Sequence, residues 1–345
     1  MTKQLEIVLP DDWHLHLRDG PAMVDALQHT CAHFGRAIVM PNLKPPVVNG
    51  QQAQAYAERI RAAVPKDMDF QPLMTIYLTD MTTPEQIIDA KKTGVVAAKL
   101  YPAGATTNSD AGVTDLAGMD DVFAAMAQCK MPLLLHGEVT THSTDIFDRE
   151  AVFVRDTLQP ILKRHSTMKV VLEHITTEVA ARFVTDGPEN LAATVTAHHL
   201  LVNRNHMLAG GIRPHLYCLP ILKRETDRVA LVRAVVSGSP RFFLGTDSAP
   251  HPISAKESDC GCAGCFTANG AMALYAEVFE SADALDKLEG FASLHGPDFY
   301  GLSRNSSRLM LVRDAQTVPM EYRFGLDRVR PFRAGEVMPW QAHRV

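Results

Sequence analysis

The amino-acid sequence predicts an α/β protein folded as a closed (β/α)8 TIM barrel. Short, continuously apolar runs alternate with segments of helical periodicity along the chain, and eight such runs can be placed. Continuously apolar runs are typical of parallel strands that are covered on both faces. We expect one barrel domain over residues 1–345. An open doubly wound sheet is the alternative, although no Gly-rich phosphate loop lies between a predicted strand and a helix.

The eight predicted strands are bounded by polar loops. They are Asp12–Leu17, Arg36–Met40, Phe70–Tyr77, Val95–Leu100, Pro132–His136, Lys169–His174, Ala192–Ala197 and Phe242–Thr246.

Helix signals lie between these runs. Pro21 precedes a predicted helix at Ala22–His33, and Thr83-Pro84-Glu85 resembles an N-cap followed by proline at the first helical position. Further helices are predicted at Gln51–Ala63, Met119–Gln128, Pro220–Val236 and Ala268–Glu280. We expect the remaining tail, Pro319–Val345, to be irregular, solvated surface with Arg323, Arg328, Arg330 and Arg333.

Composition excludes several classes of function. Apolar residues make up 46% of the chain and charged residues 21%, as in ordinary globular proteins. The formal net charge of −5 gives a nucleic-acid role no electrostatic support. The N-terminal residues lack the apolar core of a signal peptide, and no apolar run is long enough to span a bilayer. We therefore expect a cytoplasmic protein with six reduced cysteines.

The stretch Asp11–Gly20 carries the clearest sign of chemistry. His14 and His16 are separated by one residue, so on a β-strand both side chains point to the same face, and Arg18 follows on that face. Such a pair can hold a cation. It can equally belong to a partly buried strand that happens to contain two histidines.

Other polar residues follow the predicted strands at the end where barrel enzymes build their sites. Each has a structural alternative: a lone histidine usually makes one hydrogen bond, Lys99 can be a surface lysine, and Asp247 can cap a helix. Their recurrence at one end of one barrel favours a shared site. The residues are His14, His16 and Arg18, then Asn42, Lys99, His136, His174, Asp247 and His251.

These residues suit zinc. Imidazoles and a carboxylate are borderline ligands, and the set formed by His14, His16, His136, His174 and Asp247 exceeds the needs of one open catalytic zinc. Two metal ions are therefore plausible. A protonated lysine cannot bind metal, whereas Lys99 carbamylated by carbon dioxide would present a bridging carboxylate.

With these residues in place, the chain resembles the short, bacterial type of dihydroorotase in the amidohydrolase superfamily, essentially from end to end. The resemblance is carried by Trp13–Gly20, Met40–Leu43, Lys99–Ala103, Leu135–Glu138, Glu173–Thr177, Gly245–His251 and Cys260–Phe266.

The resemblance implies a role for each matching residue. His14 and His16 would hold the more buried zinc with Asp247, and His136 and His174 the second zinc. Carbamylated Lys99 (N6-carboxylysine) and a hydroxide would bridge the two ions, and Asp247 would also carry the proton. Further roles are implied for substrate binding: Arg18, Asn42 and His251 would bind the substrate carboxylate, backbone groups near Leu219 and Ala263 the pyrimidine ring, and Thr106 and Thr107 would lie on a mobile loop that closes over it.

The implied reaction is ring closure of N-carbamoyl-L-aspartate to L-dihydroorotate in pyrimidine synthesis, by a homodimer. Two alternatives stay open. A hydantoinase-like enzyme for a neutral cyclic amide would have no reason for a carboxylate clamp, and a catalytically silent scaffold would be expected to lack a ligand. The spacing of Cys260, Cys262 and Cys265 also allows a separate structural zinc site, although no fourth ligand is evident.

Overall fold

The computed structural model describes residues 3–345 and contains the predicted barrel. Its eight parallel strands follow one another in chain order around the sheet. They are β2 (Asp11–Leu15), β3 (Arg36–Val39), β4 (Gln71–Tyr77), β5 (Ala97–Leu100), β6 (Leu133–His136), β7 (Val170–Glu173), β8 (Leu191–Val195) and β9 (Phe242–Leu244). All eight predicted strands are confirmed, each of them shorter by one or two residues at an end.

The barrel closes just beyond the C-terminal ends of its first and last strands. Asp247 N donates to His14 O at 2.9 Å, and His16 N donates to Ser248 O at 3.2 Å. The pairing of β2 with β3 is irregular between Asp12 and Leu15. Closure therefore joins the segment that carries two histidines directly to the segment that carries Asp247.

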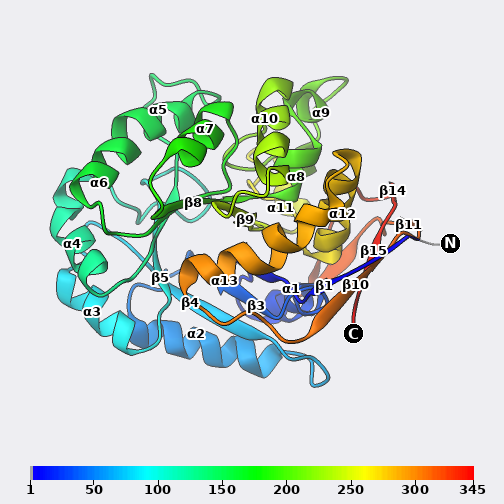
Figure 1. The fold of residues 1–345 in the computed structure, drawn as a ribbon, viewed down its shortest axis with the longest axis horizontal. Helices are drawn as coiled ribbons and strands as arrows, with labels where there is room; N and C mark the ends of the chain where they lie inside the picture. Colours follow the sequence, from blue (N-terminus) through cyan, green and yellow to red (C-terminus); the bar gives the residue numbers. More distant parts are fainter. Residues whose placement is uncertain (1–2) are drawn as a thin grey trace.

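Helices surround the strands (Figure 1). The α-helices are α1 (Pro21–Cys31), α2 (Gly50–Ala63), α3 (Pro84–Lys92), α4 (Asp120–Gln128), α5 (Arg149–Phe153), α6 (Gln159–Arg164), α7 (Glu178–Asp186), α8 (Ala197–Leu201), α9 (Arg204–Leu208), α10 (Glu225–Val236), α11 (Ile253–Lys256), α12 (Ala271–Ser281) and α13 (His295–Tyr300). Single turns of π-helix form η2 (Val154–Leu158) and η6 (Gly290–Leu294), and 3₁₀ turns form η1 (Ala117–Met119), η3 (Pro214–Leu216), η4 (Ala268–Gly270) and η5 (Leu285–Lys287). None of the helices described is long and apolar enough to cross a membrane.

Local signals explain several boundaries. Thr83 and Gln86 form the capping box of α3, with Pro84 at the first helical position, as the sequence predicts. The strand predicted to run to Ala197 ends at Val195, because the Thr196 side chain accepts a hydrogen bond from His199 N and caps α8.

Two sequence expectations are wrong. The helix predicted from Pro220 begins only at Glu225, because Cys218–Arg224 runs as an irregular segment past the mouth of the barrel. The tail is also ordered. It contains β12 (Tyr322–Phe324), β13 (Asp327–Val329), β14 (Val337–Met338) and β15 (Gln341–Arg344), while β14 pairs with β11 (Gln316–Thr317). Trp340 is fully buried and donates to Glu280 at 3.0 Å, so this part of the tail packs into the core. Arg323 and Arg328 are exposed, as the sequence predicts.

A second small sheet joins the two ends of the described chain. β1 (Gln4–Val8) pairs antiparallel with β10 (Arg308–Val312), and β10 pairs with β15. Figure 1 shows these strands together at one edge of the molecule.

Candidate active site

Three side chains converge on one point at the mouth of the barrel. His14 Nε2 and His16 Nε2 are 3.2 Å apart, and Asp247 Oδ1 lies 3.4 Å from the first and 3.2 Å from the second. A single proton can occupy only one of these three contacts, whereas a cation satisfies all of them. Tetrahedral zinc with bonds of 2.0–2.2 Å separates its ligand atoms by roughly 3.3–3.6 Å. The donor set and its spacing therefore fit a zinc ion.

The local backbone explains this convergence. His14 lies on β2 and His16 directly follows the strand's last residue, Leu15, so alternation directs both side chains to one side. The hydrogen bond from Asp247 N to His14 O fixes the third side chain. Arg18, His174 and Asp247 all have positive φ, at 65°, 42° and 44°. Such conformations cost energy and collect where a site holds its side chains in set positions.

His136 and His174 lie beside this cluster. Their rings are 4.9 Å apart between centroids, and the His174 ring is 4.8 Å from that of His14. Glu138 Oε2 lies 2.8 Å from His136 Nε2, which leaves Nδ1 as the nitrogen available to a metal. His174 Nδ1 is buried and has no hydrogen-bond partner. Both imidazoles thus retain a free nitrogen for a second cation.

Lys99 is fully buried on β5 and contacts the carboxylate of Glu173. The other oxygen of that carboxylate lies 2.9 Å from His14 Nδ1. Lys99 Nζ also sits 4.7 Å from the centroid of the Tyr101 ring. Glu173 therefore links the lysine to a histidine of the three-atom cluster.

The cluster has strongly perturbed acid–base properties. Burial opposes protonation of His14, but Glu173 and Asp247 favour it and raise its pKa to about 9. At His16 burial prevails and lowers the pKa to about 4. Burial alone would raise the pKa of Asp247, yet the neighbouring histidines hold it well below its usual value. Burial also lowers the pKa of Lys99. The two carboxylates thus draw positive charge into a buried site.

Arg18 forms the next layer of the pocket. Its Nε donates to Pro250 O at 3.0 Å, and its Nη2 lies 2.9 Å from His251 Nε2. Burial lowers the pKa of His251 to about 2, so the imidazole is neutral and accepts from the guanidinium. A guanidinium has five N–H donors, so these two contacts leave several for an anion.

Asn42 links the cluster of His14, His16 and Asp247 to the loop above it. Its Oδ1 lies 2.8 Å from His16 Nδ1, and its Nδ2 donates to Thr107 O at 3.1 Å. Thr107 Oγ1 donates to Ala263 O at 3.3 Å across the pocket, and Thr106 O accepts from Ser109 Oγ at 2.6 Å. The loop lies closed, and the pocket beneath it has only about 20 Å³ of free volume. A substrate ring therefore requires the loop to move.

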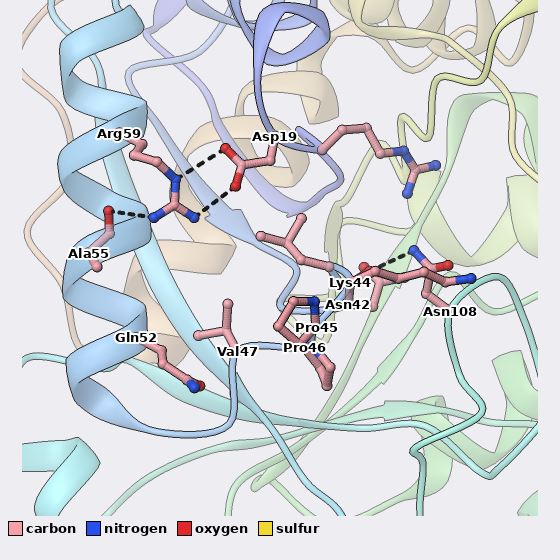
Figure 2. A pocket seen from close by; sticks show the side chains of 12 residues that line it. Asp19, Asn42, Lys44, Pro45, Pro46, Val47, Gln52, Ala55, Arg59 and Asn108 are labelled. Carbon is pink, nitrogen blue, oxygen red and sulfur yellow. Dashed lines mark hydrogen bonds and ion pairs between the residues drawn. The ribbon is translucent and has the colours of Figure 1, made fainter.

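A second, open pocket of about 420 Å³ adjoins the first and shares Arg18 and Asn42 with it. Figure 2 shows it between α2 and the loop that contains Lys44. Arg59 on α2 makes two hydrogen bonds with Asp19, at 3.1 and 2.8 Å. The charge of Arg59 is therefore neutralised by Asp19 at the rim of this second pocket.

The structure brings the predicted site residues into one region. All but three line the closed pocket directly: His16, Arg18, Asn42, Thr106, Thr107, His136, His174, Leu219, Asp247 and Ala263. The other three lie just behind its wall, where His14 contacts Asp247, Lys99 contacts Glu173, and His251 contacts Arg18.

The three cysteines singled out by spacing do not converge. Cys260 is exposed and Cys262 half-buried, while Cys265 is buried and lies within 4.8 Å of His198 and Cys218, measured between potential ligand atoms. The separate site suggested for Cys260, Cys262 and Cys265 is therefore not formed.

Sequence reasoning missed two carboxylates. Glu138 orients His136, and Glu173 links His14 with Lys99. A signal was present, because both acids stand within two residues of a predicted ligand, in His136-Gly137-Glu138 and in Glu173-His174. Carboxylates that hold metal-binding histidines are a recurrent feature of metal sites.

Comparisons with known proteins agree with this geometry. The sequence model of the amidohydrolase family matches residues 8–328. A dihydroorotase of Ralstonia pickettii is 60% identical over 343 residues, which cover 99% of this chain and 100% of that relative. The crystal structure of dihydroorotase from Campylobacter jejuni has a TM-score of 0.91 at 34% identity, covering 99% of this chain and 98% of that one. Dihydroorotase from Saccharomyces cerevisiae, solved with 5-fluoroorotic acid, has a TM-score of 0.90 at 32% identity, with the same coverage. The chain therefore belongs to the amidohydrolase family and, within it, to the dihydroorotases.

Proposed function

We propose that this enzyme interconverts N-carbamoyl-L-aspartate and L-dihydroorotate in pyrimidine biosynthesis, with two zinc ions at the mouth of the barrel. The observation that carries the proposal is the position of Arg18. It follows His14 and His16 closely, three residues beyond the end of β2, and it lines the same closed pocket as Asp247. A metal cluster and an anion clamp thus face one small pocket.

The proposed ligands are the convergent side chains of the pocket together with Lys99. His14, His16 and Asp247 would hold one ion, His136 and His174 the other, and carbamylated Lys99 would bridge them. When bound, the metal ions would polarise the ring carbonyl and make water a better nucleophile at neutral pH. The neutral imidazole of His16 and the buried carboxylate of Asp247 suit such cations.

The remaining chemistry falls to residues of the chain. In the hydrolytic direction water attacks the ring amide carbon, and the bond from that carbon to the ring nitrogen breaks. Asp247 takes the proton from the attacking water and gives it to the leaving nitrogen. Ring closure reverses these transfers and releases water.

Substrate binding is assigned to the pocket wall. Arg18 would bind the substrate carboxylate through the parallel N–H groups of its guanidinium, with Asn42 and His251 beside it. Thr106 and Thr107 would close over the ring and exclude water. Backbone groups near Leu219 and Ala263 would bind the polar edge of the ring.

The two other interpretations fit less well. A hydantoinase-like enzyme for neutral rings gives no reason for a half-buried Arg18 with free donors that lines the pocket. A silent scaffold would be expected to have lost a ligand, whereas His14, His16, His136, His174, Lys99 and Asp247 are all present.

The test is direct. Purified protein supplied with zinc and bicarbonate should consume dihydroorotate and form N-carbamoyl-aspartate, and elemental analysis should find two zinc ions per chain. A ¹³C resonance from labelled carbon dioxide that is lost in K99A would support carbamylation, and light scattering would test the homodimer. Zinc-loaded protein without turnover in either direction would refute the proposal.

A further inference from the structure

Lys256, the last residue of α11, has an unusual environment for a lysine. Its side chain is buried, with the residue only 3% exposed. Its Nζ donates to three backbone carbonyl oxygens, those of Tyr217 at 2.7 Å and of Cys262 and Gly264 at 2.8 Å each. A neutral amine has two N–H groups, so three acceptors require the ammonium form. The main chain thus satisfies this buried cation completely.

The three carbonyls belong to two segments that form one wall of the reaction pocket. Tyr217 stands two residues before Leu219, while Cys262 and Gly264 flank Ala263. Leu219, Ala263 and Gly264 line the closed pocket.

Besides Lys256, side-chain packing joins these two segments, because Cys265 packs with Cys218, Ile221 and Leu222 and its Sγ contacts His215 O at 3.5 Å. Neither Cys218–Arg224 nor the residues from 257 to 267 contain helix or extended sheet. One backbone hydrogen bond links them, from Gly264 N to Tyr217 O at 3.0 Å. The packing is also close, since a Cβ on Gly264 would lie 2.4 Å from Ala249 O. A small displacement of either segment would therefore change the shape of the pocket.

We infer that Lys256 is a positioning residue, whose ammonium holds the Leu219 and Ala263 segments at the spacing that binds the substrate ring. The inference rests on the proposed function, which assigns ring binding to these two backbone segments. Lys256 itself does not line the pocket. It also holds the wall against which the loop closes, because Thr107 donates to Ala263 O. Its contribution should therefore be to binding and much less to the chemical step.

The experiment compares K256M with a matched control. In R241M the lost cation also serves backbone carbonyls, because Arg241 donates to those of Gly187 and Pro188. Arg241 precedes β9, however, and so lies at the opposite end of the barrel from the pocket. Both variants should lower Tm. Only K256M should change binding.

Three measurements separate the roles: steady-state kinetics with both substrates, calorimetric titration with orotate, and thermal unfolding. In K256M we expect KM and the Kd for orotate to rise about tenfold or more, with kcat reduced less than about threefold. In R241M, KM, the Kd for orotate and kcat should each stay within about twofold of their wild-type values. A K256M enzyme with unchanged KM and Kd and a lower Tm would overturn the inference, as would a large loss of kcat at unchanged KM.

A second variant, K256Q, keeps the inference testable if K256M folds poorly. K256Q retains two N–H donors without the charge, and we expect an intermediate increase in KM and Kd; no increase would overturn the inference. Hydrogen–deuterium exchange gives a readout that needs no turnover. Exchange in residues 215–220 and 261–266 should be faster in K256M than in R241M, and equal exchange would overturn the inference. Absence of wild-type turnover would instead refute the proposed function.

Discussion

Replacement of Arg18 by methionine should remove recognition of the substrate carboxylate and little else. The guanidinium uses Nε on Pro250 O and Nη2 on His251, and its other donors remain for the anion. Two charge-assisted hydrogen bonds contribute roughly 1.5–3 kcal/mol each, so we expect kcat/KM to fall about 10²- to 10⁴-fold. Most of the loss should appear as a higher KM, because the carboxylate does not react.

The assay pairs ligands that differ only in the carboxylate. Wild-type enzyme should bind orotate much more tightly than uracil, and R18M should lose most of that difference. R18K keeps the charge but not the planar fork, so it should fall between the two. R59M is the matched control, because Arg59 is paired with Asp19 at the rim of the adjoining pocket (Figure 2). It should change KM less than about twofold. A KM for R18M within about threefold of wild type would refute the reasoning.

Four further changes test other parts of the structure. D247N should lower kcat about 10³-fold, since an amide can neither take the proton nor supply a negative ligand; near-normal turnover would contradict its assigned role. K99A should lose both activity and bound zinc, measured by elemental analysis before and after chelation. T107V, which cannot donate to Ala263 O, should raise KM about fivefold to tenfold without changing metal content. Burial holds the pKa of His33 at about 4, below its ordinary value of 6.5. The unfolded chain therefore takes up that proton first as the pH falls, and the stability gained from neutral His33, complete above about pH 6.5, should decrease by about 2 kcal/mol by pH 5. Urea unfolding of H33Q should show a correspondingly flatter pH dependence, and an unchanged slope would exclude this cause.

The sequence carries strong information about elements whose environment is uniform. Strands such as Leu133–His136 are apolar throughout because both faces are covered, so they could be placed without any knowledge of their partners. Their ends could also be placed on a common rim, and this predicted that His14 and Asp247 would lie close together. Those distant residues are in fact joined by a backbone hydrogen bond.

Other features depend on contacts that no local pattern records. Pro220–Arg224 directly precedes α10 and was predicted to belong to it, yet this segment is not helical. It lies at the pocket wall, where His199 Nε2 is 3.0 Å from Pro220 O. Trp340 is buried through long-range packing and a bond to Glu280, so its polar neighbours made the tail resemble surface. Lys256 carries no local signal of its role, because its three acceptors are main-chain atoms whose positions the sequence does not show.

The small sheet formed by β1, β10 and β15 also affects how the chain folds while it is being translated. During synthesis on the ribosome, Gln4–Val8 emerges early but pairs with residues from 308 onwards, about 300 positions later. Until β10 has been synthesised, the edge of β1 has no pairing strand and is exposed to other chains. The nascent protein therefore depends on late residues to cover its first strand, immediately upstream of the histidines at 14 and 16. Chaperone demand and aggregation during overexpression should accordingly be greatest for chains that stop short of β10.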